Sequence, residues 1–108
     1  NSSYLTAVSN DYGFEKTYSR MIEASGKSGD ILLALSTSGN SANVIQALKK
    51  ANELGMKTIG LSGSSGGEMN GLCHTLLKIP SSSAARIQEA HILIGHIICE
   101  LVEEKIFE

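Results

Sequence analysis

The chain of 108 residues has no tryptophan, one proline and two cysteines, and only 5% of its residues are aromatic. So few aromatic side chains argue against a platform on which bases or sugars stack. Nine Lys and Arg stand against eleven Asp and Glu, so the basic stripe of a nucleic-acid binder is also missing. No apolar run reaches the roughly 20 residues that span a bilayer, and residues 1–10 lack the basic start of a signal peptide. We therefore expect neither a nucleic-acid nor a membrane partner.

The two cysteines, Cys73 and Cys99, form no CxxC or zinc-finger spacing. Each stands in an apolar stretch, so the sequence predicts two buried, reduced thiols. Unpaired thiols are typical of the cytosol, and we expect a cytoplasmic protein.

Apolar blocks of strand length are present, and they alternate with helical patterns. The strands are predicted at residues 31–35, 57–61 and 75–79, and the two main helices at 42–54 and 84–106. Short connections between such elements favour right-handed crossovers, so we expect an α/β fold with a parallel sheet and flanking helices. The unbroken apolar block at 31–35 predicts a strand buried on both faces.

The remaining segments are less regular. Residues 1–12 are predicted to be irregular, with a short possible strand near 5–8. A helix is predicted from residue 14, and residues 68–72 are predicted to form one or two helical turns. The chain begins in mid-pattern without Met, so residues 1–108 are interpreted as the C-terminal portion of one larger domain.

The last predicted helix is apolar around most of its circumference between residues 90 and 102. A helix of this kind is buried on all sides, which a domain of this size rarely achieves alone. The pattern therefore predicts an interface with a second copy of the chain, with Gly95 allowing close approach.

Residues 36–41, Ser-Thr-Ser-Gly-Asn-Ser, join the first predicted strand to a helix N-terminus. In open α/β sheets ligands bind outside the carboxyl ends of the strands, and free helix N–H groups suit a phosphate. The segment has no P-loop lysine, which favours a small monophosphate ester. The alternative is a simple N-cap and turn. A second Ser/Gly-rich segment, residues 62–67, is predicted to be a flexible surface loop.

His74 is expected to face solvent, whereas His91 and His96 lie within the apolar helix. Imidazole transfers protons near neutral pH or binds a metal, although a buried histidine is more often part of the core. Gln88 and His96 are about 12 Å apart along a straight helix, so one ion would need long converging side chains, a bend or another chain.

Residues 29–30 and 36–41 resemble the phosphosugar-binding signature of sugar isomerase (SIS) domains. Residues 86–92 with His96, and residues 10–14, narrow the resemblance to the phosphoheptose isomerase (sedoheptulose 7-phosphate isomerase) family. The resemblance covers essentially the whole chain. It implies the doubly wound, three-layer SIS fold, apparently without its N-terminal portion.

The family interconverts D-sedoheptulose 7-phosphate and D-glycero-D-manno-heptose 7-phosphate, which opens the route to ADP-heptose for the lipopolysaccharide core of Gram-negative bacteria. Its members are cytoplasmic homotetramers with active sites between subunits. The resemblance implies that His96 is the acid/base histidine and that Gln88 and His96 are ligands where zinc is bound. The substrate would be held by Asn10, Asp11, Ser36, Thr37, Ser38, Ser41 and Gln88.

One departure from the family is clear. The family's Asn-Gly-Gly loop and His/Glu pair, which supply the catalytic carboxylate, match nothing in these residues, so we expect them upstream of Asn1 and expect the 108 residues alone to be inactive. Two alternatives are a non-catalytic SIS adaptor that binds the replication initiator DnaA and a phosphosugar-sensing domain. An adaptor needs no acid/base histidine, so His96 favours the isomerase in part.

Overall fold

The computed structural model describes all 108 residues, and it opens with helix α1 (Ser2–Tyr12). The prediction of an irregular segment with a strand near residues 5–8 was therefore wrong. The side chain of Asn1 caps α1 by accepting the N–H groups of Ser3 (2.9 Å) and Tyr4 (3.2 Å). Val8 is the only buried residue of α1.

The helix predicted from residue 14 is present but divided. A 3-10 turn, η1 (Phe14–Lys16), leads into α2 (Thr17–Ser25). The expected apolar face of this segment is largely open, because Phe14, Tyr18 and Met21 are exposed. Tyr18, Met21 and Ile22 of this face line an all-apolar hollow of about 350 Å³, together with residues 32–35 of the first strand and Val44 and Ala47 of the next helix.

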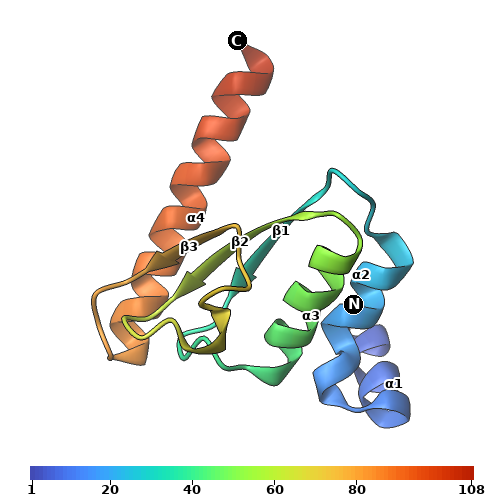
Figure 1. Ribbon diagram of the computed structural model, residues 1–108. Coiled ribbons are helices and arrows are strands. Elements are labelled where there is room, and N and C mark those ends of the chain that lie inside the picture. Colours follow the sequence, from blue (N-terminus) through green and yellow to red (C-terminus); the bar gives the residue numbers. More distant parts are fainter.

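The rest of the chain alternates strands and helices as predicted. The order is β1 (Ile31–Leu35), α3 (Ala42–Glu53), β2 (Lys57–Ser62), the 3-10 turn η2 (Gly67–Met69), β3 (Thr75–Lys78) and α4 (Ala84–Phe107). The strands form one parallel sheet in the order β1-β2-β3, with Leu33 opposite Ile59 and Ile59 opposite Thr75. Figure 1 shows this α/β arrangement, which confirms the predicted fold class.

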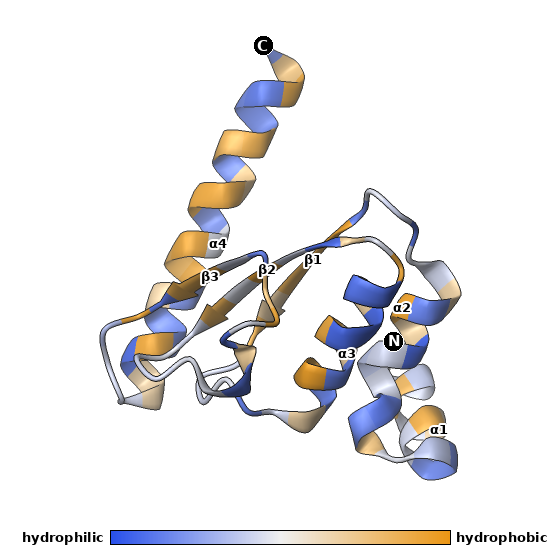
Figure 2. Cartoon of the chain, viewed as in Figure 1, coloured by the Kyte–Doolittle hydropathy of each residue, from blue (hydrophilic) through white to orange (hydrophobic).

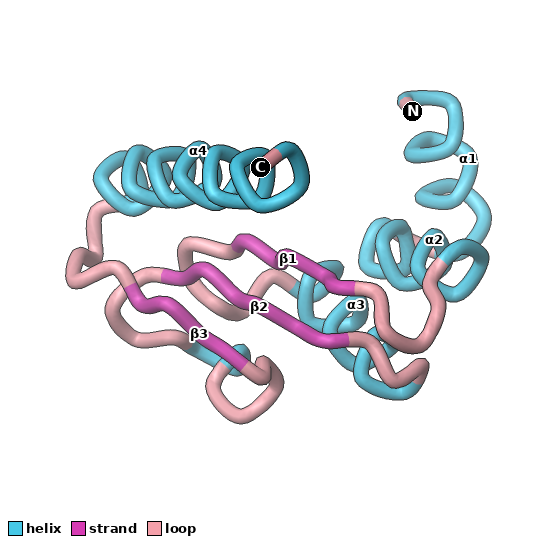
Figure 3. Tube along the Cα trace, turned by 90° about the horizontal axis from the view of Figure 1, so that it is seen from above, coloured by secondary structure: helices cyan, strands magenta, loops and turns pink.

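Helices lie on both faces of the sheet, as Figure 3 shows from above. On one face α3 and η2 enclose a core of Ala34, Ile45, Leu48 and Met69. On the other face α4 packs through Ile87, which is buried. α2 packs against α3 rather than directly on the sheet centre. The three layers bring the carboxyl ends of the strands and the start of α4 to the same end of the molecule.

The predicted burial of β1 on both faces was wrong for this chain, whereas the second copy predicted to cover α4 stays a prediction. Ile31, Leu33 and Leu35 share one face of the edge strand β1, and they stay exposed because no helix packs closely over that face. In α4 only Ile87 and His91 are buried, because the second half of the helix extends past the sheet (Figure 1). Much of the α4 ribbon is orange, that is hydrophobic, in Figure 2. The exposed apolar residues of α4 are Ile92, Leu93, Ile97, Leu101, Val102, Ile106 and Phe107.

The cysteines are less enclosed than the sequence suggested. Cys73 is half-buried and Cys99, on the extended part of α4, is exposed; both are free thiols. None of the helices has the length and apolar character needed to cross a bilayer.

Candidate anion-binding site

The segment between β1 and α3, residues 36–41, is here called the anion loop. Ser36 is buried and organises it: its Oγ accepts the N–H groups of Gly39 (3.1 Å) and Ser41 (3.4 Å). The same Oγ lies 2.8 Å from the Ser41 hydroxyl. The conformation of the loop is therefore held by a side chain from within it.

The N-terminus of α3 is left without a cap. Ser41 occupies the N-cap position, but its side chain makes no capping hydrogen bond and pairs with Ser36 instead. The backbone N–H groups of Ala42 and Asn43 have no acceptor in the chain. Unpaired N–H groups at the positive end of a helix dipole attract anions. The geometry thus favours the phosphate interpretation over the N-cap alternative.

A second loop, residues 63–69, fixes the anion loop from outside and is here called the clamp loop. Gly63 donates its N–H to the Thr37 carbonyl (3.0 Å), and Met69 donates to Gly39 (3.1 Å). The Glu68 N–H donates to Oδ1 of Asn40 (2.8 Å). Within the loop predicted at residues 62–67, Ser64 and Ser65 are exposed as expected, but Gly63 is tied to the anion loop. The local composition gives no sign of that long-range bond.

The two loops touch at their glycines. Gly39 has φ +70°, and a Cβ placed on it would lie 2.1 Å from the carbonyl oxygen of Gly66. No side chain fits in that space. Glycine is therefore required at position 39 for two reasons: the backbone is left-handed there, and the two loops approach too closely to admit a Cβ.

The anion loop opens into a hollow of about 370 Å³ between β1, α3 and the first turns of α4. No Lys, Arg, Asp or Glu is among its lining residues, so its attraction for an anion comes from hydroxyl and amide dipoles. The lining residues are Leu35, Ser36, Thr37, Ser41, Gln88, His91 and Ile92. Thus Ser36, Thr37, Ser41 and Gln88, four of the predicted substrate-binding residues, come together there.

The other predicted site residues lie elsewhere. Ser38 belongs to the anion loop, where its Oγ accepts the Asn40 N–H (3.1 Å), but it does not line the hollow. Asn10 and Asp11 are exposed on α1 and bond to each other (3.0 Å). His96 is exposed two turns beyond Gln88 on α4.

The residues of this chain do not by themselves fit a zinc site. No three His, Cys, Asp or Glu side chains lie close enough together to hold a metal ion. Gln88 lines the hollow, but His96 does not. No chemical step is therefore assigned to a metal here.

His91, which the sequence offered with His96 as a proton-transfer or metal candidate but did not select, lines the hollow. It is 4% exposed, and its Nε2 donates to the carbonyl oxygen of Ser62 at the end of β2 (3.1 Å). Its position three residues after Gln88 on the helix was the available signal, since such residues are neighbours on a helix surface.

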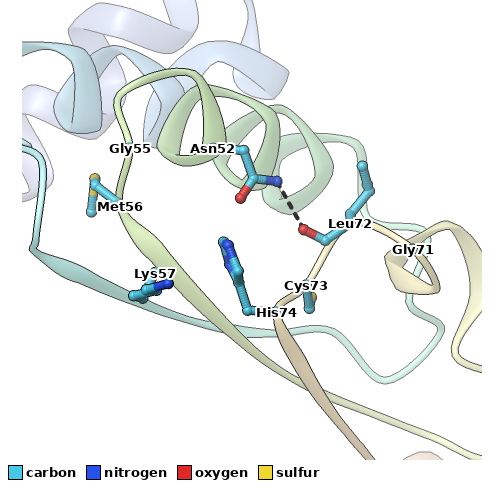
Figure 4. A pocket seen from close by; sticks show the side chains of 8 residues that line it. All are labelled: Asn52, Gly55, Met56, Lys57, Gly71, Leu72, Cys73 and His74. Carbon is cyan, nitrogen blue, oxygen red and sulfur yellow. Dashed lines mark hydrogen bonds between the residues drawn. The ribbon is translucent and has the colours of Figure 1, made fainter.

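A larger hollow, about 460 Å³, lies at the opposite end of the sheet (Figure 4). There the Nδ1 of His74 accepts the Thr58 N–H (3.1 Å), and Asn52 donates to the Leu72 carbonyl (2.8 Å). Burial raises the pKa of the Cys73 thiol in its wall. The hollow is at the amino ends of β2 and β3, away from the edge where α/β sheets bind ligands.

Comparison with known proteins agrees with the loop geometry. The SIS domain family matches residues 1–63, and the chain belongs to that family. It is 53% identical to phosphoheptose isomerase of Aneurinibacillus thermoaerophilus over 106 residues, which are 98% of this chain and 54% of that protein. Phosphoheptose isomerase 2 of Campylobacter jejuni is also 53% identical, with 98% and 53% covered.

Among solved structures, phosphoheptose isomerase from Neisseria gonorrhoeae superposes with a TM-score of 0.91 at 46% identity. The match covers 94% of this chain and 58% of that one. The resemblance read from residues 10–14, 36–41 and 86–96 is therefore confirmed. The chain spans about half the length of the relatives it matches.

Proposed function

We propose that the protein carrying this chain is a phosphoheptose isomerase that converts D-sedoheptulose 7-phosphate to D-glycero-D-manno-heptose 7-phosphate. The observation that carries the proposal is the uncapped N-terminus of α3 behind a loop of hydroxyls, a cradle for one phosphate group. The names of the relatives point to the same reaction. No observation favours the adaptor or the sensor.

The phosphate end of the substrate would be held by this chain's own groups. The free N–H groups of Ala42 and Asn43 and the hydroxyls of Thr37, Ser38 and Ser41 would donate to the phosphate oxygens. This grip orients the sugar without taking part in bond making, because the reacting carbons lie at the other end of the chain of seven carbons. The sugar would extend from the hollow past Gln88.

The isomerisation moves a carbonyl from C2 to C1. A base removes a proton from C1 while the C2 carbonyl oxygen gains one, giving an enediol. The enediol then takes a proton at C2 and loses the proton of its C1 hydroxyl, which leaves the aldehyde. We assign the transfers between oxygens to His96, since imidazole gains and loses protons near neutral pH. A carboxylate from outside these residues would be the base at carbon.

His96 lies on the part of α4 that extends past the sheet. We also propose that a second copy of the chain packs against this part of the helix. Seven exposed Ile, Leu, Val and Phe side chains on one helix form the kind of surface that oligomers bury. The proposed assembly is a cytoplasmic homotetramer. Its packing would enclose His96 in a site shared between chains with Asn10 and Asp11, and zinc on Gln88 and His96 would require ligands from that larger site.

The first test is His96→Gln in the intact protein. Isomerisation, followed by ¹³C NMR of the sugar phosphates, should fall to the background rate, while the affinity for sedoheptulose 7-phosphate should change less than threefold. Unaltered turnover in the variant would remove His96 from the reaction. No turnover by the unmodified protein would remove the proposed function itself.

The second test addresses α4. Leu101→Asp places a charge in the exposed apolar surface and should convert the assembly to monomers in sedimentation velocity. Glu103→Gln, two residues away, is the matched control and should leave the assembly intact. A monomeric unmodified protein would refute the proposed interface.

A further inference from the structure

The second nitrogen of His91 has no partner within the chain. Nε2 donates to the Ser62 carbonyl, which can only accept, so Nε2 carries a proton. Every buried side-chain nitrogen and oxygen in the structure has a hydrogen-bond partner, and Nδ1 has none. Nδ1 is therefore not buried. Because His91 is only 4% exposed and lines the hollow beside the anion loop, this small opening leads into the hollow.

In the neutral imidazole, a ring that donates at Nε2 presents an acceptor at Nδ1. An acceptor does not suit a phosphate oxygen, which has no proton to offer. It suits a hydroxyl group lying next to the phosphate. The other polar groups of the hollow are Ser36, Thr37, Ser41 and Gln88, so His91 is the only side chain there whose free polar atom solely accepts.

We propose that His91 is a specificity-determining residue that accepts a hydrogen bond at Nδ1 from a hydroxyl of the bound sugar phosphate. The inference rests on the proposed function, because the phosphate must sit on the anion loop for the neighbouring hydroxyl to reach His91. The bond from Nε2 to Ser62 fixes the ring in the orientation that faces the hollow. His91 thus favours a phosphate ester that carries a neighbouring hydroxyl group over one that has none, such as methyl phosphate.

Two substitutions separate this role from a structural one. In His91→Gln the side-chain amide can still donate to the Ser62 carbonyl, but the acceptor at the Nδ1 position is lost. In His91→Asn the shorter side chain keeps an acceptor near that position and loses the bond to Ser62. If His91 binds the sugar, His91→Gln should lose more sugar affinity than His91→Asn. If His91 only supports the structure through Ser62, His91→Asn should lose more.

The measurements are calorimetric affinities of the intact protein for sedoheptulose 7-phosphate and for methyl phosphate, with the melting temperature of each variant. We expect His91→Gln to bind sedoheptulose 7-phosphate about tenfold more weakly, the size of one hydrogen bond, and methyl phosphate as before. His91→Asn should keep more of the sugar affinity and melt at a lower temperature.

Unchanged affinity of His91→Gln for the sugar phosphate would overturn the role of His91. An equal loss for both ligands would also overturn it, since that result means a distorted anion loop. If the unmodified protein binds sedoheptulose 7-phosphate no better than methyl phosphate, both this inference and the proposed function fail. If it binds and isomerises the sugar while His91→Gln is unaffected, only the inference fails.

Discussion

The two ends of the sheet each carry a hollow with a histidine, and they differ in how their polar groups are satisfied. At the amino end Nδ1 of His74 accepts the Thr58 N–H and Asn52 donates to the Leu72 carbonyl, while Nε2 of the exposed His74 has no partner in the chain. At the carboxyl end the first N–H groups of α3 and one nitrogen of His91 have no partner. The amino-end hollow is the larger, at about 460 Å³ against 370 Å³. The unpaired N–H groups of a helix N-terminus, rather than volume, identify the candidate site.

The largest effect is expected from a methyl group added where the two loops touch. Gly39→Ala would place Cβ against the Gly66 carbonyl oxygen, and we expect a loss of about 3 kcal/mol or more in the free energy of unfolding. Gly71, in the wall of the amino-end hollow, is the matched control. It also has a positive φ (+81°), but a Cβ there would meet nothing within 4 Å. Gly71→Ala should cost only about 1–2 kcal/mol of backbone strain.

Urea denaturation of both variants measures the difference. Equal losses would mean that the clamp and anion loops can move apart without cost. The carboxyl end of the sheet would then hold its loops no more rigidly than the amino end.

A smaller effect should separate the two ends in binding. Ser38→Ala removes a hydroxyl of the anion loop and should weaken phosphosugar binding by about 1 kcal/mol or more, roughly fivefold. Asn52→Ala removes the bond to the Leu72 carbonyl at the amino end. It should lower stability by about 1 kcal/mol and leave the affinity unchanged. Calorimetry of both variants with sedoheptulose 7-phosphate decides whether the loop is a binding site or only a turn.

The smallest effect concerns Cys73 and pH. Its raised pKa, caused by burial, means that the folded protein keeps the thiol protonated where the unfolded chain releases the proton. This contribution to stability is complete below the ordinary pKa of a thiol and is lost as the pH rises above it. Stability measured in urea between pH 7 and pH 10 should therefore fall less steeply for Cys73→Ser. Identical slopes would show that the thiol is not shielded in solution.

Much of the fold could be predicted from the sequence, and the failures have common causes. The strands were recognisable because short apolar blocks separated by Gly and Ser clusters are typical of a parallel sheet. Helix α1 was missed although Tyr4, Val8 and Tyr12 recur at helical spacing, because the polar residues between them weaken the pattern. The exposure of β1 could not be predicted, because hydropathy reports what a side chain prefers and not which surface is available to cover it. For α4 the sequence already indicated that the chain alone does not cover the helix.

For the site, composition and position pointed to residues 36–41, and a motif pointed to Gln88 and His96, of which only Gln88 lines the hollow. They could not show that Ser41 leaves α3 uncapped, or that His91 presents a free nitrogen to the hollow. The clamp loop was hidden for the same reason, since the bond between Asn40 and Glu68 joins residues 28 positions apart.

The sequence by itself determined the order of the elements, the parallel sheet and the identity of the anion loop, because each depends on short-range patterns of apolar, glycine and hydroxyl residues. Only the tertiary structure decided which polar groups are satisfied and which are left for a ligand. A hydrogen bond depends on distances of about 3 Å between atoms that the chain brings together from distant positions, and no local pattern contains those distances.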